Sequence, residues 1–400
     1  MSMEEWKEYR LGDFMQFNPK EKIAKGKVSR KIAMDQLVPF CRDVDSQVYE
    51  EYKGGAKFRN GDTIMARITP CLENGKTSYI SSLEDDEVAF GSTEYIVLRN
   101  IEGVSDSRFV YYLSICPEIR GVAIKSMVGS SGRQRVQQDV LENYCVSLPS
   151  LPTQQKIANI LSSLDDKIEV NRRINEQLEE LAQPLFKSWF IDFEPFKDGE
   201  FEDSKLGMIP KGWKVGTLGD VADVVMGSSP AGSSYNTEGD GSIFYQGRTD
   251  FGFRFPCVRM YTTEPKRFAE SNSVLLSVRA PVGDVNIAFE KCCIGRGLAS
   301  IKSNCNADSY TYYLMKSLKP VLDNYNNEGT VFGCINKDAL NNLSIVVPTV
   351  EIIEEFERIA SSFDVEIRRR SEEITHLTTL RDTLLPKLMS GEIDVNEVEI

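Results

Sequence analysis

Residues 151–190 read LPTQQKIANILSSLDDKIEVNRRINEQLEELAQPLFKSWF, and this stretch decides the architecture of the chain. Its apolar residues recur at alternating steps of four and three, with charged residues between them. That spacing places one apolar stripe along a long helix, and its period of about 3.5 residues is that of a coiled-coil seam. Such a helix needs a partner. The expected seam residues of this first helix are Ile157, Leu161, Leu164, Ile168, Leu178 and Leu185.

The expected partner helix lies 199 residues further along the chain. Apolar residues keep the same spacing there, and its expected seam residues are Phe356, Phe363, Ile367, Ile374, Leu377 and Leu384. From residue 139 to residue 190 the offset holds without a gap over fifty-two positions, of which twelve are identical. An apolar stripe does not require a match of Pro149 with Pro348, or a shared Ser-Ser-x-Asp run. The two stretches therefore belong to a duplicated segment.

The duplication extends to the first residues of the chain. Trp-Lys and Leu-Gly-Asp within residues 6–13 recur in the same order within residues 213–220. A period of roughly 200 residues is too long for a solenoid, so we expect two tandem copies of one domain-plus-helix unit. The expected parts are a first domain at 1–150, a first helix at 151–191, a linker at 192–207, a second domain at 208–350, a second helix at 351–390 and a tail at 391–400.

The net charge of −13 is distributed unevenly along the 400 residues. The helical segments 151–205 and 351–400 carry −5 and −7, whereas segments 1–150 and 206–350 carry −2 and +1. A domain that is neutral overall can still present a basic face, and local patches decide phosphate binding. The acidic composition therefore does not exclude a nucleic-acid partner, and the acidic helices are expected to face proteins or solvent.

Other global features exclude several classes of protein. No run of about 18 apolar residues is present and residues 1–5 lack a leader pattern, so we expect a cytosolic protein without membrane contact. The nine cysteines are an odd number and form no Cys-x-x-Cys pair. This usage favours reduced, buried thiols over a disulfide framework or a zinc site.

Both domains are expected to be rich in β-structure. In the first domain, residues 63–69, 88–98 and 144–148 have strand-forming character. Basic or polar loops lie beside them at residues 20–31 and 129–135. Glycine and serine let a backbone approach a phosphate, while arginine and glutamine can contact a base edge. An ordinary solvated loop has the same composition, so both interpretations stay open at this point.

The motifs of DNA-modifying and DNA-translocating enzymes are missing from the sequence. The best match to the Asn/Asp-Pro-Pro-aromatic tetrapeptide of adenine methyltransferases is Asn18-Pro-Lys, which lacks the second proline and the ring. No Walker Gly-x-x-x-x-Gly-Lys-Ser/Thr motif occurs. The single histidine, His376, falls within the second helix and is expected on its surface. We therefore expect no catalytic residue and no metal site in this chain.

Several motifs, in the same order along the chain, give it a specific resemblance. It resembles a specificity subunit of a type I restriction-modification system, from Trp6 to about Ile393. The motifs that carry the resemblance are ARITPCLENGK at 66–76, FGSTEY at 90–95, YQGRTDF at 245–251, RAPVGD at 279–284, IGRG at 294–297, and the helical LPSLPTQQKI at 148–157 with LSSLDDKI at 161–168.

This resemblance implies an α+β fold and a role without chemistry of its own. It implies two β-rich target recognition domains, each followed by a long helix, with the helices paired as an antiparallel coiled coil about a pseudo-twofold axis. Each domain would read one half of a bipartite, asymmetric DNA site, and the helices would set the spacer and dock methyltransferase subunits, usually two. Restriction subunits would add translocation. S-adenosylmethionine, ATP and Mg²⁺ would belong to the partner subunits, with no cofactor in this chain.

For contact with double-stranded DNA we select basic and polar loop residues over strand residues. In the first domain these are Lys20, Lys22, Lys25, Lys27, Arg30, Lys31, Asn74, Lys76, Arg133, Gln134 and Arg135. In the second they are Ser228, Ser229, Gln246, Arg248, Arg254, Arg279 and Arg296. The alternatives are a purely structural coiled-coil scaffold and an orphan specificity subunit that serves a methyltransferase only. A scaffold would explain the helices but not two large domains with different basic loops.

Overall fold

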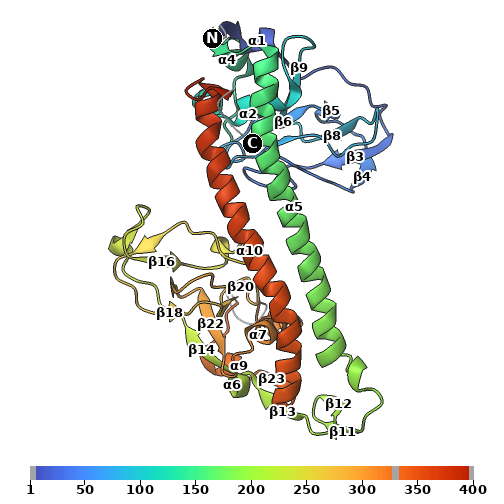
Figure 1. Cartoon of the computed structure of the whole chain (residues 1–400), viewed down its shortest axis with the longest axis vertical. Coiled ribbons are helices and arrows are strands. Elements are labelled where there is room, and N and C mark those ends of the chain that lie inside the picture. The colour runs from blue at the N-terminus through green and yellow to red at the C-terminus, as the bar shows by residue number, and fades with distance from the viewer. Residues whose placement is uncertain (1–5, 327–332, 396–400) are drawn as a thin grey trace. The chain divides into compact units, whose positions relative to one another are not determined.

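A computed structural model of the chain describes residues 6–326 and 333–395. The chain forms two compact units. Unit 1 comprises Met1–Arg173 and Arg370–Ile400, and unit 2 comprises Ile174–Arg369. Two long helices, α5 (Leu151–Phe190) and α10 (Val350–Met389), each give one half to either unit (Figure 1). The expected class is confirmed, because a long helix follows each of two β-rich regions.

The β-rich region of unit 1 contains two four-stranded sheets. The first is antiparallel, in the order β2 (Met15–Phe17), β9 (Tyr95–Asn100), β6 (Thr63–Ala66) and β7 (Thr77–Tyr79). The second has the order β4 (Tyr49–Glu51), β3 (Val28–Ile32), β8 (Ala89–Gly91) and β5 (Lys57–Phe58), with β3 and β8 parallel. A further pair joins β1 (Lys7–Arg10) to β10 (Cys145–Leu148). The short helices are α1 (Leu11–Phe14), α2 (Ser107–Ile115), α3 (Pro117–Lys125) and α4 (Gln138–Glu142).

Unit 2 repeats this arrangement. Its antiparallel sheet has the order β14 (Ala222–Met226), β22 (Leu298–Ser303), β19 (Val274–Ser277) and β20 (Val285–Ile287). Its second sheet has the order β15 (Tyr235–Asn236), β17 (Tyr261–Thr262), β16 (Ser242–Tyr245), β21 (Cys292–Ile294) and β18 (Phe268–Ala269). A pair joins β13 (Lys214–Thr217) to β23 (Ser344–Val347). The short helices are α6 (Leu218–Val221), α7 (Asp308–Ser317), α8 (Lys319–Asp323) and α9 (Lys337–Asn341), with 3-10 turns η2 (Gly232–Ser234), η3 (Arg248–Asp250) and η4 (Asn324–Asn326).

The duplication seen in the sequence is thus a duplication of topology. Each unit has a parallel strand pair in its second sheet, β3 with β8 and β16 with β21. In each unit, a strand near the start of the domain also pairs with the strand that immediately precedes the long helix: β1 pairs with β10, and β13 pairs with β23. Equivalent elements can therefore be compared directly between the units.

Within unit 1, the first half of α5 packs against the last half of α10 and the recognition domain. Ile157 and Leu161 of α5 share a buried core with Leu385 and Leu388 of α10. The ion pairs Lys167–Glu373 (3.6 Å) and Asp165–Arg381 (2.6 Å) show that the two segments run in opposite directions, because one number falls as the other rises. Polar and apolar contacts together hold these two helical segments side by side.

Within unit 2, the complementary halves meet through aromatic side chains. The ring of Phe356 on α10 lies 5.7 Å from that of Phe186 and 5.1 Å from that of Phe190 on α5, measured between centroids. Of the expected seam residues in the two units, five are buried: Ile157, Leu161, Ile168, Phe356 and Ile367. Seven are half-buried: Leu164, Leu178, Leu185, Phe363, Ile374, Leu377 and Leu384.

The expected strands of the first domain are shorter than the sequence pattern. The strand expected at 63–69 ends at Ala66, and the one expected at 88–98 is two strands, β8 and β9, separated by a turn in which the Tyr95 N–H donates to the Ser92 carbonyl. The segment expected as a linker at 192–207 is also ordered. It holds the 3-10 turn η1 (Glu194–Phe196) and the hairpin of β11 (Phe201–Ser204) with β12 (Gly207–Pro210).

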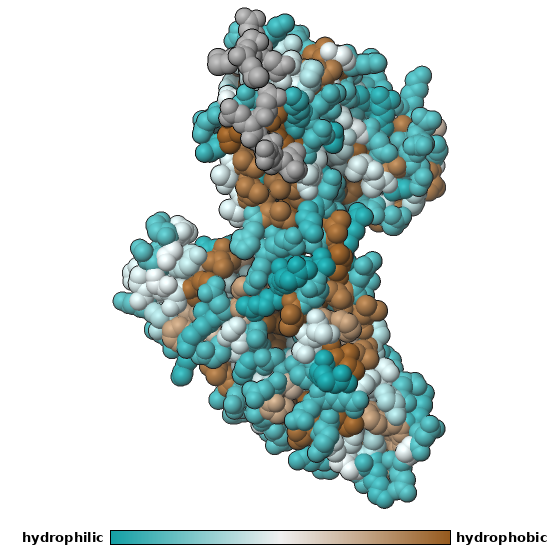
Figure 2. Space-filling view, viewed as in Figure 1, coloured by the Kyte–Doolittle hydropathy of each residue, from teal (hydrophilic) through white to brown (hydrophobic). Residues whose placement is uncertain are grey.

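The helices also differ from the membrane-crossing kind. Over residues 6–326 and 333–395, no helix combines the length and apolar character that a bilayer crossing requires. The face shown in Figure 2 is mostly hydrophilic, with smaller hydrophobic groups between the polar side chains. Of the expected tail at 391–400, residues 396–400 lie outside the described residues.

Candidate nucleic-acid interface

Four lysines of unit 1 lie in the loop between β2 and β3, and all four are exposed: Lys20, Lys22, Lys25 and Lys27. A loop of this kind lets flexible ammonium groups reach phosphate oxygens without reorganising the fold. The neighbouring residue Lys31 is half-buried on β3, and its ammonium lies 2.9 Å from the carboxylate of Glu50. The four exposed lysines therefore form the more available part of the expected basic segment.

Arg30 corrects the prediction for the same segment. It lies on β3 with only 4 % of its surface exposed, because its guanidinium donates to the Ser82 carbonyl (2.9 Å) and pairs with Glu87 (3.2 Å). Burial by itself would lower the pKa of Arg30, but the Glu87 carboxylate and the Tyr49 side chain together outweigh this and raise it. The side chain is therefore occupied within the fold, and we remove Arg30 from the candidate DNA contacts.

The second candidate segment of unit 1 is the loop at 129–135. Arg133 is exposed and Gln134 is half-buried. Arg135 is exposed, but its guanidinium donates two hydrogen bonds to the Glu94 carboxylate in a bidentate ion pair (2.6 and 2.9 Å). The hydrogen bonds from Arg135 hold the pKa of the Glu94 carboxyl below its usual range. A guanidinium held in this way is oriented before any ligand arrives.

The last two candidates of unit 1 lie in one turn. Asn74 is exposed, whereas the ammonium of Lys76 donates to the Met34 carbonyl at 2.7 Å. Lys76 is therefore partly occupied by the fold.

Three loops of unit 2 converge on one surface that contains Ser228, Ser229, Gln246 and Arg296. The Arg296 N–H donates to the Ser229 hydroxyl at 3.2 Å, and the Ser228 N–H donates to the Ile294 carbonyl at 3.0 Å. Glycine makes this approach possible, because a Cβ on Gly227 would collide with the Gly295 carbonyl. The sequence alone did not show that these residues are neighbours. Arg279 is exposed on a separate loop, which bridges to Cys334.

A cleft of about 550 Å³ adjoins the exposed residue Arg248 in unit 2. Its charged lining residues are Arg248, Asp284, Lys316 and Lys319, and Phe251, Phe253 and Tyr312 add aromatic surface. Asp284 pairs with Arg248 and, at 3.0 Å, with Lys319. Burial alone would raise the pKa of Asp284, but these two cations lower it. The combination of three cations and three rings suits a phosphodiester with an adjoining base.

Sequence reasoning missed Lys316 and Lys319, which lie at the end of α7 and the start of α8. The only signal in the sequence was their spacing of three residues, which would place two basic side chains on one face if a single helix contained both. Apart from Tyr312, their neighbours in the cleft lie 30 to 71 residues away along the chain, so no local pattern could group them.

Arg254 is the second correction. It was expected at a DNA-contacting loop, but only 1 % of its surface is exposed. Its guanidinium pairs with Glu179 of α5 and Asp364 of α10 and lies over the Tyr312 ring, 3.8 Å from the centroid. Burial opposes the charge, but the surrounding tyrosines and carboxylates raise the pKa of Arg254. Because every face of the side chain is covered, it has no access to DNA in this fold.

Comparison with known proteins agrees with this two-domain arrangement. The family model of the type I restriction modification DNA specificity domain matches residues 3–180 and 210–376, once for each copy of the repeat. The chain belongs to this family. DNA recognition is the general function of type I restriction specificity subunits. The two matched ranges together contain both β-rich domains and most of both long helices.

Individual specificity subunits are similar to this one over different lengths. The putative MjaX specificity subunit of Methanocaldococcus jannaschii is 36 % identical over 267 residues, which are 65 % of this chain and 62 % of the relative. The HindI specificity subunit of Haemophilus influenzae is 24 % identical over 98 % of this chain and all of its own length. The crystal structure of the S subunit from M. genitalium has a TM-score of 0.59 at 15 % identity, with 96 % of each chain covered, and shows the same fold.

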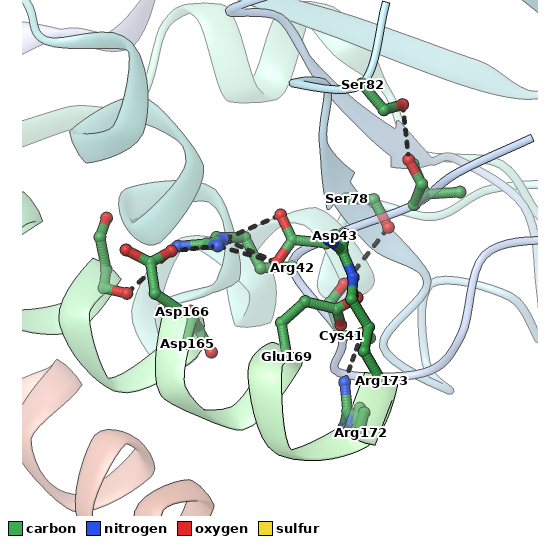
Figure 3. A network of polar contacts seen from close by, with 12 residues as sticks. Cys41, Arg42, Asp43, Ser78, Ser82, Asp165, Asp166, Glu169, Arg172 and Arg173 are labelled. Atoms are coloured by element: carbon green, nitrogen blue, oxygen red, sulfur yellow. Dashed lines mark hydrogen bonds and ion pairs between the residues drawn. The ribbon is translucent and has the colours of Figure 1, made fainter. Parts of the chain in front are cut away.

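A polar network in unit 1 of this specificity subunit was also missed from the sequence. Arg42, from the loop after β3, donates to the carboxylate of Asp166 on α5 at 2.6 Å and to that of Asp43 at 2.8 Å (Figure 3). His376, by contrast, is exposed on α10 as expected. The network lies on the helix side of the recognition domain and is therefore a structural junction.

Proposed function

We propose that this specificity subunit reads a bipartite, asymmetric DNA site, with one half-site for each recognition domain. The observation that carries the proposal is that the two domains share a core topology but have different exposed loops. Unit 1 presents an open lysine loop at 20–27, whereas unit 2 presents the surface of converging loops and the cleft beside Arg248. Two domains of one fold with different contact residues are suited to reading two different half-sites.

The proposed DNA contacts are the predicted set without its two buried arginines. They are Lys20, Lys22, Lys25, Lys27, Lys31, Asn74, Lys76, Arg133, Gln134, Arg135, Ser228, Ser229, Gln246, Arg248, Arg279 and Arg296. Lys316 and Lys319 join them as phosphate contacts in the cleft. Lysine loops contribute affinity that depends on salt, whereas Arg248, Gln246 and Arg296 have the chemistry to discriminate bases.

We further propose that α5 and α10 pair as an antiparallel coiled coil that sets the spacer between half-sites. The oppositely directed ion pairs of unit 1 and the ring contact between the two helices in unit 2 support the pairing. Asn171 and Arg370 also support it, because they are equivalent positions of the repeat, 199 residues apart, and are joined by a hydrogen bond of 2.9 Å. Each helix of 40 residues is roughly 60 Å long at about 1.5 Å per residue.

The proposed protein partners are two methyltransferase subunits, with restriction subunits that add ATP-driven translocation. Leu181 and Leu380 support two similar docking sites. They are identical and equivalent across the repeat, yet 61 % and 47 % of their surfaces are exposed. Packing within this chain does not require either leucine, and exposed apolar residues on helices commonly mark interfaces. Two other apolar residues outside the expected seams, Ile160 and Phe186, are buried in the cores of their own units and are not available for docking.

In this proposal the subunit acts in the cytoplasm and determines which DNA sequence is bound, whereas the methyltransferase and restriction subunits carry out the reactions. S-adenosylmethionine, ATP and Mg²⁺ would then be bound by the methyltransferase and restriction subunits. The acidic outer surfaces of the helices are consistent with protein contact and disfavour DNA along their length.

The test is a genome-wide map of N6-methyladenine in cells that contain the methyltransferase partner, with and without this chain. We expect one asymmetric split motif that is present only with the chain. If the partner is active but no motif depends on the chain, the proposed function is wrong and a scaffold role becomes the better explanation. If the motif appears without any restriction of incoming DNA, the chain serves a methyltransferase only.

A further inference from the structure

We propose that Arg42 and Arg254 are equivalent positioning residues, each of which fixes one recognition domain on the helical segments of its own unit. The inference rests on the proposed function, because it assigns to each arginine the correct presentation of one half-site. Neither side chain would touch DNA. Each would act through the loop that carries it.

The backbone establishes that the two positions are equivalent. Arg42 follows β3 and Arg254 follows β16, which are the parallel strands of the second sheet in each unit. The Arg42 carbonyl accepts from the Tyr79 N–H of β7 at 2.8 Å. In the same way, the Arg254 carbonyl accepts from the Ile287 N–H of β20 at 2.9 Å. Since β7 and β20 end the corresponding antiparallel sheets, the two arginines start from the same place in the fold.

In unit 2, Arg254 joins the recognition domain to both long helices. One guanidinium nitrogen pairs with Glu179 of α5 and the other with Asp364 of α10. The Tyr313 hydroxyl of α7 lies 3.0 Å from the first nitrogen, and Lys316 of α7 also pairs with Glu179. One side chain therefore fixes three elements at a single point.

In unit 1, the corresponding three elements meet at Asp165 of α5, next to the Asp166 that Arg42 binds, so the charges are distributed differently. Arg42 donates to Asp166 and to the Ser162 carbonyl of α5 (Figure 3). The adjacent carboxylate of Asp165 accepts from the Tyr112 hydroxyl of α2 and from Arg381 of α10, both at 2.6 Å. Asp165 and Asp364 are the same residue type at equivalent positions of the repeat. Tyr111–Tyr112 and Tyr312–Tyr313 occupy the corresponding helices α2 and α7.

The chemistry of these junctions favours orientation over stability. Buried ion pairs contribute little net stability, because desolvation offsets most of the attraction. A planar guanidinium held by two carboxylates is nevertheless directional, whereas apolar side chains can slide over one another. The loop of Arg254 also carries Gln246 and Arg248, and the loop of Arg42 contains Met34, whose carbonyl accepts from Lys76. A displaced junction would therefore displace the proposed DNA contacts of the same domain.

The experiment uses the full chain with its methyltransferase partner, and reads the methylated motif in cells. The test variant is R254M/D364N, which removes the buried pair without leaving an unpaired charge, since Glu179 keeps Lys316. R42M/D43N is the counterpart in unit 1, because it removes the less exposed pair and leaves only Asp166, whose side chain is 65 % exposed. The control is K291M, because Lys291 forms an exposed ion pair with Glu270 (2.7 Å) in unit 2.

We expect R254M/D364N to melt close to the wild-type temperature but to lose discrimination in one half of the motif by about tenfold, the cost of one base contact. R42M/D43N should relax the other half, and K291M should relax neither. R254K, which keeps the charge but can engage one carboxylate at a time, should fall between wild type and R254M/D364N.

Folded R254M/D364N that retains full fidelity in both halves would overturn the inference, and so would equal loss in both halves. If R254M/D364N is not recovered folded, R254K takes its place, and its loss of discrimination is compared between the two halves of the motif in the same way. A wild-type chain that directs no split motif would instead refute the proposed function, and the two failures are therefore distinguishable.

Discussion

Lys22, Lys25 and Lys27 extend into solvent from one loop of unit 1, and their proposed role is contact with phosphates. Replacing all three with alanine should weaken binding to every DNA sequence while leaving the preferred motif unchanged. Each lost phosphate contact should reduce the slope of log K against log salt by about 0.9, so the largest expected reduction is about 2.7. Fluorescence anisotropy with motif-containing and random duplexes, at four salt concentrations, measures both quantities.

A matched control removes the same charge elsewhere. Lys197, Lys205 and Lys211 are exposed in and beside the hairpin that follows α5, and none is a proposed contact. Their combined replacement should leave the salt slope unchanged. Equal effects of the two triple variants would mean that net charge, and not the loop, governs the affinity.

Glu179 gives a pH-dependent prediction. Burial alone would raise its pKa, but Arg254 and Lys316 outweigh this and lower it below the ordinary 4.5. Its stabilising contribution is therefore present above pH 4.5 and is lost as the pH falls through the lowered value. Asp364 also pairs with Arg254, but no lysine is among the groups that shift its pKa, and burial raises that pKa. E179Q should thus melt at a lower temperature than wild type at pH 7, with the difference shrinking below pH 4.5.

Differential scanning fluorimetry of both proteins between pH 7 and pH 3.5 measures this difference. A constant difference over the whole range would show that Glu179 acts through packing and not through its charge.

At the residue scale, sequence reasoning identified basic loops but could not separate surface arginines from buried ones. Arg30 and Arg254 have the composition of contact residues, yet their partners Glu87, Glu179 and Asp364 lie 57 to 110 residues away. No local pattern predicts such pairs. Lys316 and Lys319 were missed for the same reason, because the cleft that makes them relevant is built from distant loops.

At the scale of elements, the two long helices could be predicted to within one or two residues at each end. Their apolar period persists over 40 residues, and few competing structures satisfy it. The strands could not be predicted as well, because most are two to five residues long and depend on partners elsewhere in the chain. Pro184 and Pro386 belong to a residue type that ordinarily kinks or ends a helix, but both helices continue past them.

The equivalent leucines of these helices carry the prediction about partners. Replacing Leu181 or Leu380 with serine should remove one methyltransferase site each, while the melting temperature stays unchanged because both side chains are exposed. Loss of one buried leucine contact corresponds to about 1.5–3 kcal/mol, or roughly ten- to more than hundredfold in affinity. Mass photometry of the assembled complex should show one bound subunit instead of two.

Val365 provides the control for this experiment. Its side chain is 67 % exposed on α10, but its equivalent in α5 is the polar Asp166. V365S should therefore leave two methyltransferase subunits bound. Two bound subunits in L181S and L380S as well would contradict the docking proposal.

At the scale of the whole molecule, the duplication could be predicted from the sequence but the composition of the units could not. The expected order was domain, helix, domain, helix, whereas each compact unit combines one domain with half of both helices. The reason is that Leu385, Leu388 and Met389 of α10 complete the buried core of unit 1, a pairing that no local pattern contains.

The proposed role of the helices predicts how the spacer should respond to their length. Inserting seven residues after Arg173 and after Arg369 preserves the seam pattern and lengthens each helix by about 10 Å. The methylated motif should then keep both half-sites, with a spacer longer by about three base pairs at 3.4 Å each. An insertion in one helix alone should abolish methylation, because the seam falls out of register. An unchanged spacer after both insertions would contradict the role of the helices.

The division of α10 between the units also bears on how the protein is made. The ribosome completes residues 174–369 of unit 2 before it reaches Leu385, Leu388 and Met389, which the core of unit 1 requires. At synthesis rates of about 5–20 residues per second, the first domain waits roughly 10–40 s for these residues. During that time the apolar faces of Ile157 and Leu161 lack their final cover. The second half of the gene product should therefore mature first, and the nascent first domain should be the part that engages chaperones.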